Sequence, residues 1–253
     1  MSKKKIIIYL VLIIIFGLIT YFGYKIYKTL SDNKKIEDEI IKIKDEVIIN
    51  KNDDITPNEE DNNDNNDNNI TIETEKLTMD FNKLKSINND TVAWIKINNT
   101  NIDYPVVKTN NNEYYLNHSF YKYSNINGWI FLNSENDSNF TDENTVIFGH
   151  NTNSYTMFSE LRDIYKGNLG NSIYINIYTE KDSFTYQVFS IYLENPNNTS
   201  NISKYINQST IVTMKNKSKI NFDINVSKDD KILTLSTCNN ITNDRLVMHA
   251  KKI

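Results

Sequence analysis

The only cysteine of the chain lies close in sequence to one of its only two arginines. Among 253 residues there are one cysteine, Cys238, and three histidines, and Arg245 follows Cys238 by seven positions. His150 ends the apolar run TVIFGH. A thiolate can attack a carbonyl, an imidazole can move the proton, and a guanidinium can stabilise the oxyanion without losing its own proton. These three groups therefore suffice for acyl transfer, although spacing alone does not bring them together.

Each of these residues also has a simpler explanation. A lone cysteine is more often a buried core residue than a nucleophile. A histidine at the end of a strand can be a surface or capping residue, and Arg245 can form a surface salt bridge, which is common and weakly stabilising. The turn-rich segment NNITND between Cys238 and Arg245 allows the chain to return alongside itself. Such a return would place Arg245 beside Cys238 and favours the catalytic interpretation.

Three other polar residues compete for a role in the site. His249 shares a strand face with Arg245, but four residues along a strand span about 13 Å, so we favour His150 as the catalytic histidine. His118, in YYLNHSFY, is interpreted as structural. Arg162 lies in the helix-like run MFSELRDIY, whose acidic residues offer surface pairing, and is assigned no function.

Short β-like runs dominate the C-terminal part of the chain and would position these residues. They are rich in Ile, Val, Tyr and Phe, and several alternate apolar with polar residues. The runs are Val92–Ile97, Ile102–Val107, Trp129–Leu132, Thr145–Phe148, Ser172–Thr179, Phe184–Leu193, Lys231–Ser236 and Leu246–Lys251. Helical stretches are expected at Lys76–Asn88, Asn112–Asn117, Met157–Tyr165 and Ile202–Lys215. This pattern predicts a mainly β fold, a closed barrel or sandwich with helical insertions.

Strand parity places Cys238 away from the predicted core. In the run KILTLSTC, Leu233 and Leu235 fall on one face, and Ser236 and Cys238 fall on the other. Cys238 also stands at the end of the strand, where loops begin and functional residues concentrate. We therefore expect an apolar inner face and a reactive outer face on this strand.

The N-terminal run Ile6–Tyr24 contains no charged residue. Its 19 residues nearly span the hydrocarbon core of a membrane, which is about 30 Å thick. A cleaved signal peptide has a shorter apolar region, of about 7–15 residues, that ends at small residues, whereas the first alanine here is Ala93. Lysines flank both ends of the run, so charge barely orients it. We expect an uncleaved anchor with a cytoplasmic N-terminus, because a five-residue tail is easier to retain than to export.

Two further segments separate this anchor from the globular part. Residues 34–49 repeat apolar residues at helical spacing between charges, which we interpret as a solvated stalk helix. Residues 50–69 are polar and repetitive and predict a flexible spacer. The expected organisation is an anchor over 1–28, a stalk and linker over 29–74, and one domain over 75–253.

Composition excludes several classes of protein. One cysteine cannot form an intrachain disulfide or a structural zinc site that needs several thiolates. A formal charge of −4, with no basic cluster beyond the N-terminus, argues against nucleic-acid binding. Six glycines include no GxGxxG or P-loop motif.

The motif TLSTC followed by Arg245 resembles the signature of sortases, and IFGHNT with MFSEL resembles the region around the sortase histidine. The stretches VAWIKINNTNIDYPVV, NNEYYLNHSFY and GWIFL resemble class B sortases in particular. Cys238 follows His150 by 88 positions, which leaves room for the helical insertion that marks class B. The resemblance covers residues 75 to 253.

This resemblance implies an eight-stranded β-barrel and a cysteine transpeptidase on the outer face of Gram-positive cells. Such an enzyme cleaves a C-terminal sorting motif after Thr through a thioester and joins the protein to a peptidoglycan amine or its lipid-linked precursor. It implies Cys238 as nucleophile, His150 as general acid/base and Arg245 as donor to substrate or oxyanion. No cofactor is implied.

The resemblance also implies substrate-groove residues, namely Ser236 within TLSTC, and Asn112 and Leu116 within NNNEYYLN. No acidic cluster matches the calcium site of some class A members, so no metal is expected. Class B sortases commonly read NPxT-type motifs, but the exact motif, the anchored protein and the oligomeric state do not follow from the sequence.

Two other functions stay open from the residues alone. One is a non-enzymatic, membrane-anchored surface binding domain whose cysteine is merely buried. The other is a cell-wall cysteine peptidase. Papain-like enzymes place the cysteine before the histidine in the chain, and here the order is reversed.

Overall fold

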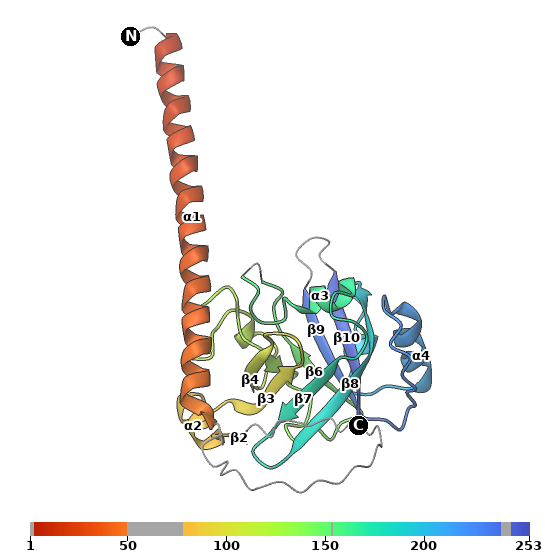
Figure 1. Ribbon diagram of the computed structural model, residues 1–253. Helices are drawn as coiled ribbons and strands as arrows, with labels where there is room; N and C mark the ends of the chain where they lie inside the picture. Colours follow the sequence, from red (N-terminus) through yellow and green to blue (C-terminus); the bar gives the residue numbers. More distant parts are fainter. Residues whose placement is uncertain (1–2, 50–77, 153, 239–243) are drawn as a thin grey trace, which may run out of the picture.

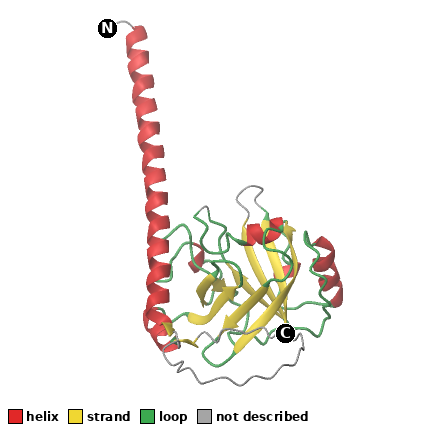
Figure 2. Ribbon diagram, in the orientation of Figure 1, coloured by secondary structure: helices red, strands yellow, loops and turns green. Residues whose placement is uncertain are grey.

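Eight strands close into a β-barrel in the computed structural model, which describes residues 3–49, 78–152, 154–238 and 244–253. The order around the barrel is β10-β8-β7-β3-β4-β5-β6-β9. Strands occupy the centre of the molecule and helices its periphery (Figure 2). The strands are β3 (Thr91–Ile97), β4 (Asp103–Val107), β5 (Phe131–Leu132), β6 (Asn144–Phe148), β7 (Tyr174–Tyr178), β8 (Ser183–Glu194), β9 (Ile232–Cys238) and β10 (Arg245–Lys252). Each corresponds to one of the predicted runs.

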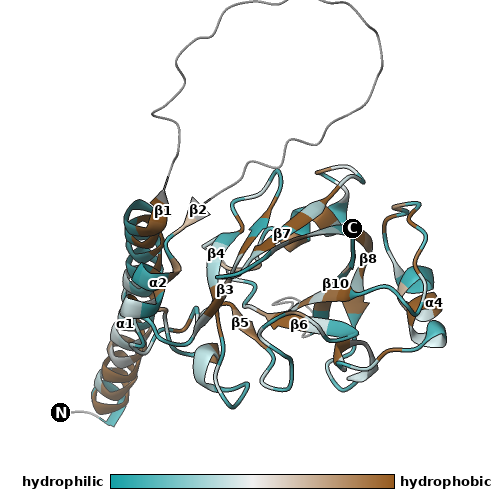
Figure 3. Cartoon of the chain, turned by 90° about the horizontal axis from the view of Figure 1, so that it is seen from below, coloured by the Kyte–Doolittle hydropathy of each residue, from teal (hydrophilic) through white to brown (hydrophobic). Residues whose placement is uncertain are grey.

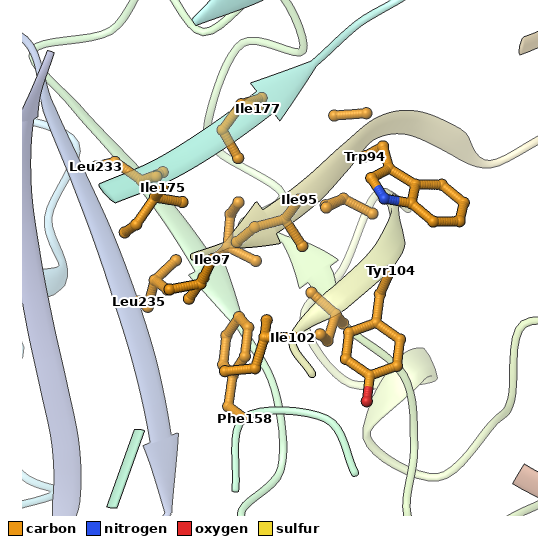
Figure 4. Packing of buried hydrophobic residues seen from close by; sticks show 14 of the residues in the cluster. Trp94, Ile95, Ile97, Ile102, Tyr104, Phe158, Ile175, Ile177, Leu233 and Leu235 are labelled. Carbon is orange, nitrogen blue, oxygen red and sulfur yellow. The ribbon is translucent and has the colours of Figure 1, made fainter. Parts of the chain in front are cut away.

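The barrel interior is filled by aliphatic side chains from alternate strand positions. Because side chains alternate between the two faces of a strand, every second residue points inward. Figure 4 shows these side chains meeting inside the barrel. Those of β3, β7 and β9 are Ile95, Ile97, Ile175, Ile177, Leu233 and Leu235, and none of them exposes surface to solvent. The predicted inner face of β9 is therefore confirmed.

The register of β6, β9 and β10 sets the relative positions of their ends. β6 runs parallel to β9, with Phe148 opposite Ser236. β10 runs antiparallel to β9, with Arg245 opposite Cys238. The ends of three neighbouring strands therefore meet at one rim of the barrel.

Short helices cover the outside of the barrel. They are α2 (Phe81–Ile87), η1 (Tyr114–Leu116), α3 (Leu161–Lys166), η2 (Ser200–Ile202) and α4 (Gln208–Lys217). α2 starts later than the predicted Lys76–Asn88, because Asp80 caps it by accepting the backbone N–H of Lys83 at 2.9 Å. Just before this cap, β2 (Thr78–Met79) pairs with β1 (Ile48–Ile49).

One unbroken helix, α1 (Lys3–Val47), contains the apolar run and all of the predicted stalk except its last two residues, which form β1. It stands on one side of the barrel, and α4 lies on the opposite side (Figures 1 and 3). The N-terminal part of α1 exposes its apolar side chains and packs on no other part of the described structure. By length and composition, α1 is the one helix among the described residues that could cross a membrane.

The expectation of a solvated stalk is wrong for one face of α1. Ile36, Ile43 and Val47 are fully buried and belong to the same hydrophobic cluster as the barrel interior. Lys44 pairs with Asp103 of β4 at 3.0 Å. The apolar stripe that looked like an isolated amphipathic helix is thus the contact surface of a docked one. The predicted spacer, 50–69, lies outside the described residues.

Candidate active site

A cavity of about 320 Å³ lies on the outer face of the barrel, where β6, β9 and β10 end. Residues from all three strands form its floor, and the loops around η1 and η2 form its walls. The lining residues are Asn112, Leu116, Phe131, Phe148, Gly149, His150, Thr199, Ile202, Ser236, Thr237 and Arg245. Five of the six residues predicted to serve the site, all but Cys238, line this cavity.

Strand register brings His150 level with Cys238. Each lies two residues beyond the parallel pair Phe148–Ser236. The backbone N–H of Gly149 donates to the carbonyl of Ser236 at 3.3 Å, which keeps the two chains together past the end of β6. A Cβ at Gly149 would lie 2.7 Å from the ring of Phe158, so only glycine fits there.

One hydrogen bond orients the His150 ring. Its Nε2 lies 2.7 Å from the carbonyl oxygen of Leu116. A carbonyl oxygen only accepts, so Nε2 must carry the hydrogen. Nδ1 is then the ring nitrogen left for proton transfer, and the partner of Nε2 sets the tautomer.

Arg245 lines the cavity beside the end of β9 with part of its hydrogen-bonding capacity unused. Its Nη1 is buried and has no hydrogen-bond partner within the described part of the chain. No ion pair to Arg245 is formed among the described residues, so the salt-bridge explanation does not apply there. A buried donor without an acceptor costs about 1–3 kcal/mol. A substrate oxygen would relieve that cost.

The backbone of Cys238 ends β9. Ser236 lines the cavity, whereas Leu233 and Leu235 point into the core. The side chain of Cys238 lies outside the described part of the structure. The backbone of Cys238 pairs with that of Arg245, which lines the cavity.

The two predicted groove residues from the η1 region occupy one wall. Asn112 donates from Nδ2 to Asn133 at 3.0 Å, and its Oδ1 accepts the N–H of Ser134 at 2.8 Å. Leu116 exposes 44% of its surface at the cavity and uses its carbonyl to hold His150. Asn112 thus shapes the wall, while Leu116 offers an apolar contact.

The other two histidines lie away from the cavity. His249 is fully buried, and its ring is held by Thr234 at 2.8 Å and by Tyr192 at 3.2 Å. Burial lowers the pKa of His249 to about 3, so its ring is neutral at physiological pH. The Nδ1 of His118 lies 2.8 Å from the carbonyl of Tyr114, whose ring stacks on it.

Sequence reasoning missed the support of the loop after His150. Arg162 donates to the carbonyls of Ser159 at 3.0 Å and Thr152 at 3.4 Å, and it lies over the ring of Tyr155. It therefore braces the loop, and no ion pair with the neighbouring acidic residues is formed in the described structure. The planar guanidinium was the available signal, since only two arginines occur in the chain.

The apolar walls of the cavity were also not predicted. Phe131 and Phe148 pack with ring centroids 5.4 Å apart, and Thr199 and Ile202 approach from the η2 loop. In the sequence, these four residues look the same as residues of the core.

Comparison with known proteins gives one consistent result. A family model for the sortase domain matches residues 95–253. The chain is 30% identical over 259 residues to sortase B of Staphylococcus aureus, covering 99% of this chain and 98% of that protein. The X-ray structure of Clostridium perfringens sortase B matches with a TM-score of 0.63 and 37% identity, over 68% of this chain and 98% of that one. The Staphylococcus aureus sortase B–substrate complex matches with a TM-score of 0.62 and 32% identity, over 68% of this chain and 84% of that one.

The resemblance read from the motifs is thereby confirmed, as is the closed eight-stranded barrel. The family match spans the strands that end at the cavity and the loops that wall it. The chain belongs to the sortase family of cysteine transpeptidases, and its relatives are class B sortases.

Proposed function

We propose that the protein is a membrane-anchored transpeptidase that cuts a C-terminal sorting motif after Thr and transfers the acyl group to a peptidoglycan amine. The observation that carries this proposal is the cavity at the ends of β6, β9 and β10, where His150 and Arg245 meet at the strand end formed by Cys238. The Staphylococcus aureus relative has been solved as a complex with a substrate, which supports a substrate-binding role for this chain as well.

In the first half-reaction the Cys238 thiolate attacks the Thr carbonyl carbon. The carbonyl electrons move onto oxygen, and Arg245 donates an N–H to that oxyanion. When the intermediate collapses, the C–N bond to the following residue breaks. Nδ1 of His150 holds the proton that the Cys238 thiol lost when the thiolate formed, and it gives this proton to the departing amine, so a thioester remains on Cys238.

In the second half-reaction an amine attacks the thioester carbon. His150 takes a proton from this amine at Nδ1, and Arg245 again holds the oxyanion. The C–S bond then breaks and the thiolate of Cys238 is regenerated. Ser236, Asn112 and Leu116 hold the sorting peptide along the cavity while this happens.

The N-terminal part of α1 is the proposed anchor. Its exposed apolar side chains suit lipid, and sortases act at the cell surface. We place the N-terminus in the cytoplasm and the barrel outside, where sorting motifs and wall precursors are available.

The test is mass spectrometry of the full-length chain in detergent, incubated with a small library of sorting peptides. A matching peptide should add its acyl fragment to Cys238 and release the C-terminal fragment. An added amine should then remove the adduct and yield the ligated product.

Three results would contradict parts of this proposal. If Cys238→Ala still cleaves peptides, the thioester route is wrong. If the acyl group is lost only to water even with excess amines, the protein is a peptidase rather than a transpeptidase. If no peptide reacts and thiol reagents leave Cys238 untouched, a binding role is favoured instead.

A further inference from the structure

The docked part of α1 contacts a loop that wraps the cavity wall. The buried carboxylate of Glu39 accepts the backbone N–H of Tyr121 at 2.9 Å and the hydroxyl of Tyr123. About two turns earlier, the carbonyl of Asp32 accepts a hydrogen bond from Nδ2 of Asn125 at 3.2 Å. Burial raises the pKa of Glu39, so a charge there is costly and the two donors offset part of that cost.

Asn125 connects this contact to the cavity. Its side-chain oxygen accepts the N–H of Asn127 at 2.9 Å, and Asn127 in turn donates to Asn33 of α1 at 3.0 Å. The backbone N–H of Asn125 donates to the carbonyl of Asn117 at 2.9 Å, and the carbonyl of Asn125 accepts the N–H of Gly128 at 3.1 Å. The side-chain amide nitrogen of Asn125 thus bonds to the helix, while its other polar groups bond to residues of the loop.

Gly128 and Leu116 both contact His150 and so connect the loop to its ring. Gly128 packs so tightly that an added Cβ would lie 2.8 Å from the Leu116 carbonyl oxygen and 2.9 Å from Cδ2 of His150. The φ angle of Gly128 is +55°, which also favours glycine. The Leu116 carbonyl is the same atom that holds Nε2 of His150. A shift of the loop would therefore move both the acceptor and the surface against which the ring rests.

We propose that residues 32–47 of α1 are a positioning element of the active site, which holds His150 in its productive orientation through the loop from Leu116 to Gly128. This inference rests on the proposed function only for its kinetic readout. Residues 32–47 and the apolar run belong to one continuous helix, α1. The loop from Leu116 to Gly128 therefore contacts the same helix that forms the proposed anchor. In Figure 1 the strand ends that border the cavity lie on the side toward which the N-terminal part of α1 extends.

The test uses full-length variants in detergent, with a matched pair on the two faces of α1. Ile43 is fully buried against the barrel, whereas Ile41 is 58% exposed. Ile43→Asp should undock the helix, and Ile41→Asp should not. A milder pair is Glu39→Ala, which removes both acceptors, and Glu39→Gln, which keeps a side-chain oxygen for the Tyr121 N–H.

Two readouts separate positioning from simple stability. The chain has three histidines, so the ring signals of labelled His150 can be assigned by NMR with His150→Ala as reference. In Ile43→Asp and Glu39→Ala we expect the Nε2 signal of His150 to lose its hydrogen-bond shift. We expect kcat for sorting peptides to fall about 10- to 100-fold, with KM little changed. Ile41→Asp and Glu39→Gln should match the wild type in both readouts.

The proposal is overturned if Ile43→Asp or Glu39→Ala is folded by circular dichroism yet keeps the wild-type His150 signal and kcat. If Ile43→Asp does not fold, the Glu39 pair decides, because it leaves the apolar contact intact. The NMR readout needs no substrate. A wild-type protein that cleaves no sorting peptide would therefore count against the proposed function and leave the test of positioning in place.

Discussion

The outer face of β6, β8, β9 and β10 carries an inner group of polar residues (Asn144, Tyr192, Thr234 and His249) and an outer group at the strand ends (His150 and Arg245). The two groups differ in how their hydrogen bonds are satisfied. Near the middle of the strands, Tyr192 donates to Nε2 of His249, whose Nδ1–H donates to Thr234, and Thr234 donates to Asn144 at 2.7 Å. At the strand ends, His150 uses one ring nitrogen, and Arg245 keeps a buried donor without an acceptor in the described structure.

This difference in hydrogen bonding indicates where a ligand can bind. In the inner group each hydrogen that links one residue to the next has an acceptor. The network therefore stabilises a packed structure and leaves no free donor in this series for a substrate. In the outer group unused donors and acceptors border an open cavity. The same strands thus carry a stabilising network near their middle and groups available to a ligand at their ends.

The largest expected effect comes from removing the outer histidine. His150→Ala should lower kcat/KM for a sorting peptide about 1,000-fold, because the general acid/base is lost. The stability of the fold should change by less than about 1 kcal/mol, since the ring makes a single hydrogen bond at the cavity. Chromatographic assay of product and thermal unfolding check the two parts. Unchanged turnover in His150→Ala would transfer the role to another group.

Arg245→Lys is expected to have the next largest effect. Lysine keeps the charge but loses the planar set of donors, so kcat/KM should fall about 100-fold while the barrel stays folded. Parallel measurement of acyl-enzyme formation and of its resolution by an amine shows whether both steps suffer, as expected if the same donor serves both oxyanions. Wild-type rates in this variant would mean that charge alone suffices.

The inner histidine, His249, should affect the pH dependence of stability and not turnover. The folded-state pKa of His249 is lowered to about 3, below the unfolded value near 6.5, so the unfolded state binds more protons between these values. Stability is therefore complete above pH 6.5 and decreases as pH falls, with a limiting slope of about 1.4 kcal/mol per pH unit. Thermal unfolding of the wild type and of His249→Asn from pH 7 to 5 tests this. Parallel pH curves for the two proteins would contradict it.

The strands could be read from the sequence because they depend on local periodicity. Alternation in KILTLSTC separates Leu235 from Ser236, and the turn before Arg245 indicates a return alongside the same strand. The resemblance to sortases then selected among the few available cysteine, histidine and arginine residues.

The docking of α1 could not be read in this way. The burial of Glu39 depends on Tyr121 and Tyr123, more than eighty residues away, and periodicity contains no information on such partners. An amphipathic helix with charges between its apolar residues looks the same whether it faces water or a barrel. For the same reason the bracing role of Arg162 depended on carbonyls whose direction only the folded loop defines.

The smallest effect is expected where the inner network is interrupted without losing volume. Thr234→Val replaces the hydroxyl between His249 and Asn144 by a methyl group, so Nδ1–H of the buried ring loses its acceptor. We expect a loss of about 1–2 kcal/mol in the free energy of unfolding and unchanged kcat/KM for the folded protein. Thr234→Ser keeps the hydroxyl and is the matched control, which should recover most of the stability. A drop in turnover in Thr234→Val alone would mean that the inner network also positions the cavity, and that the two groups are not independent.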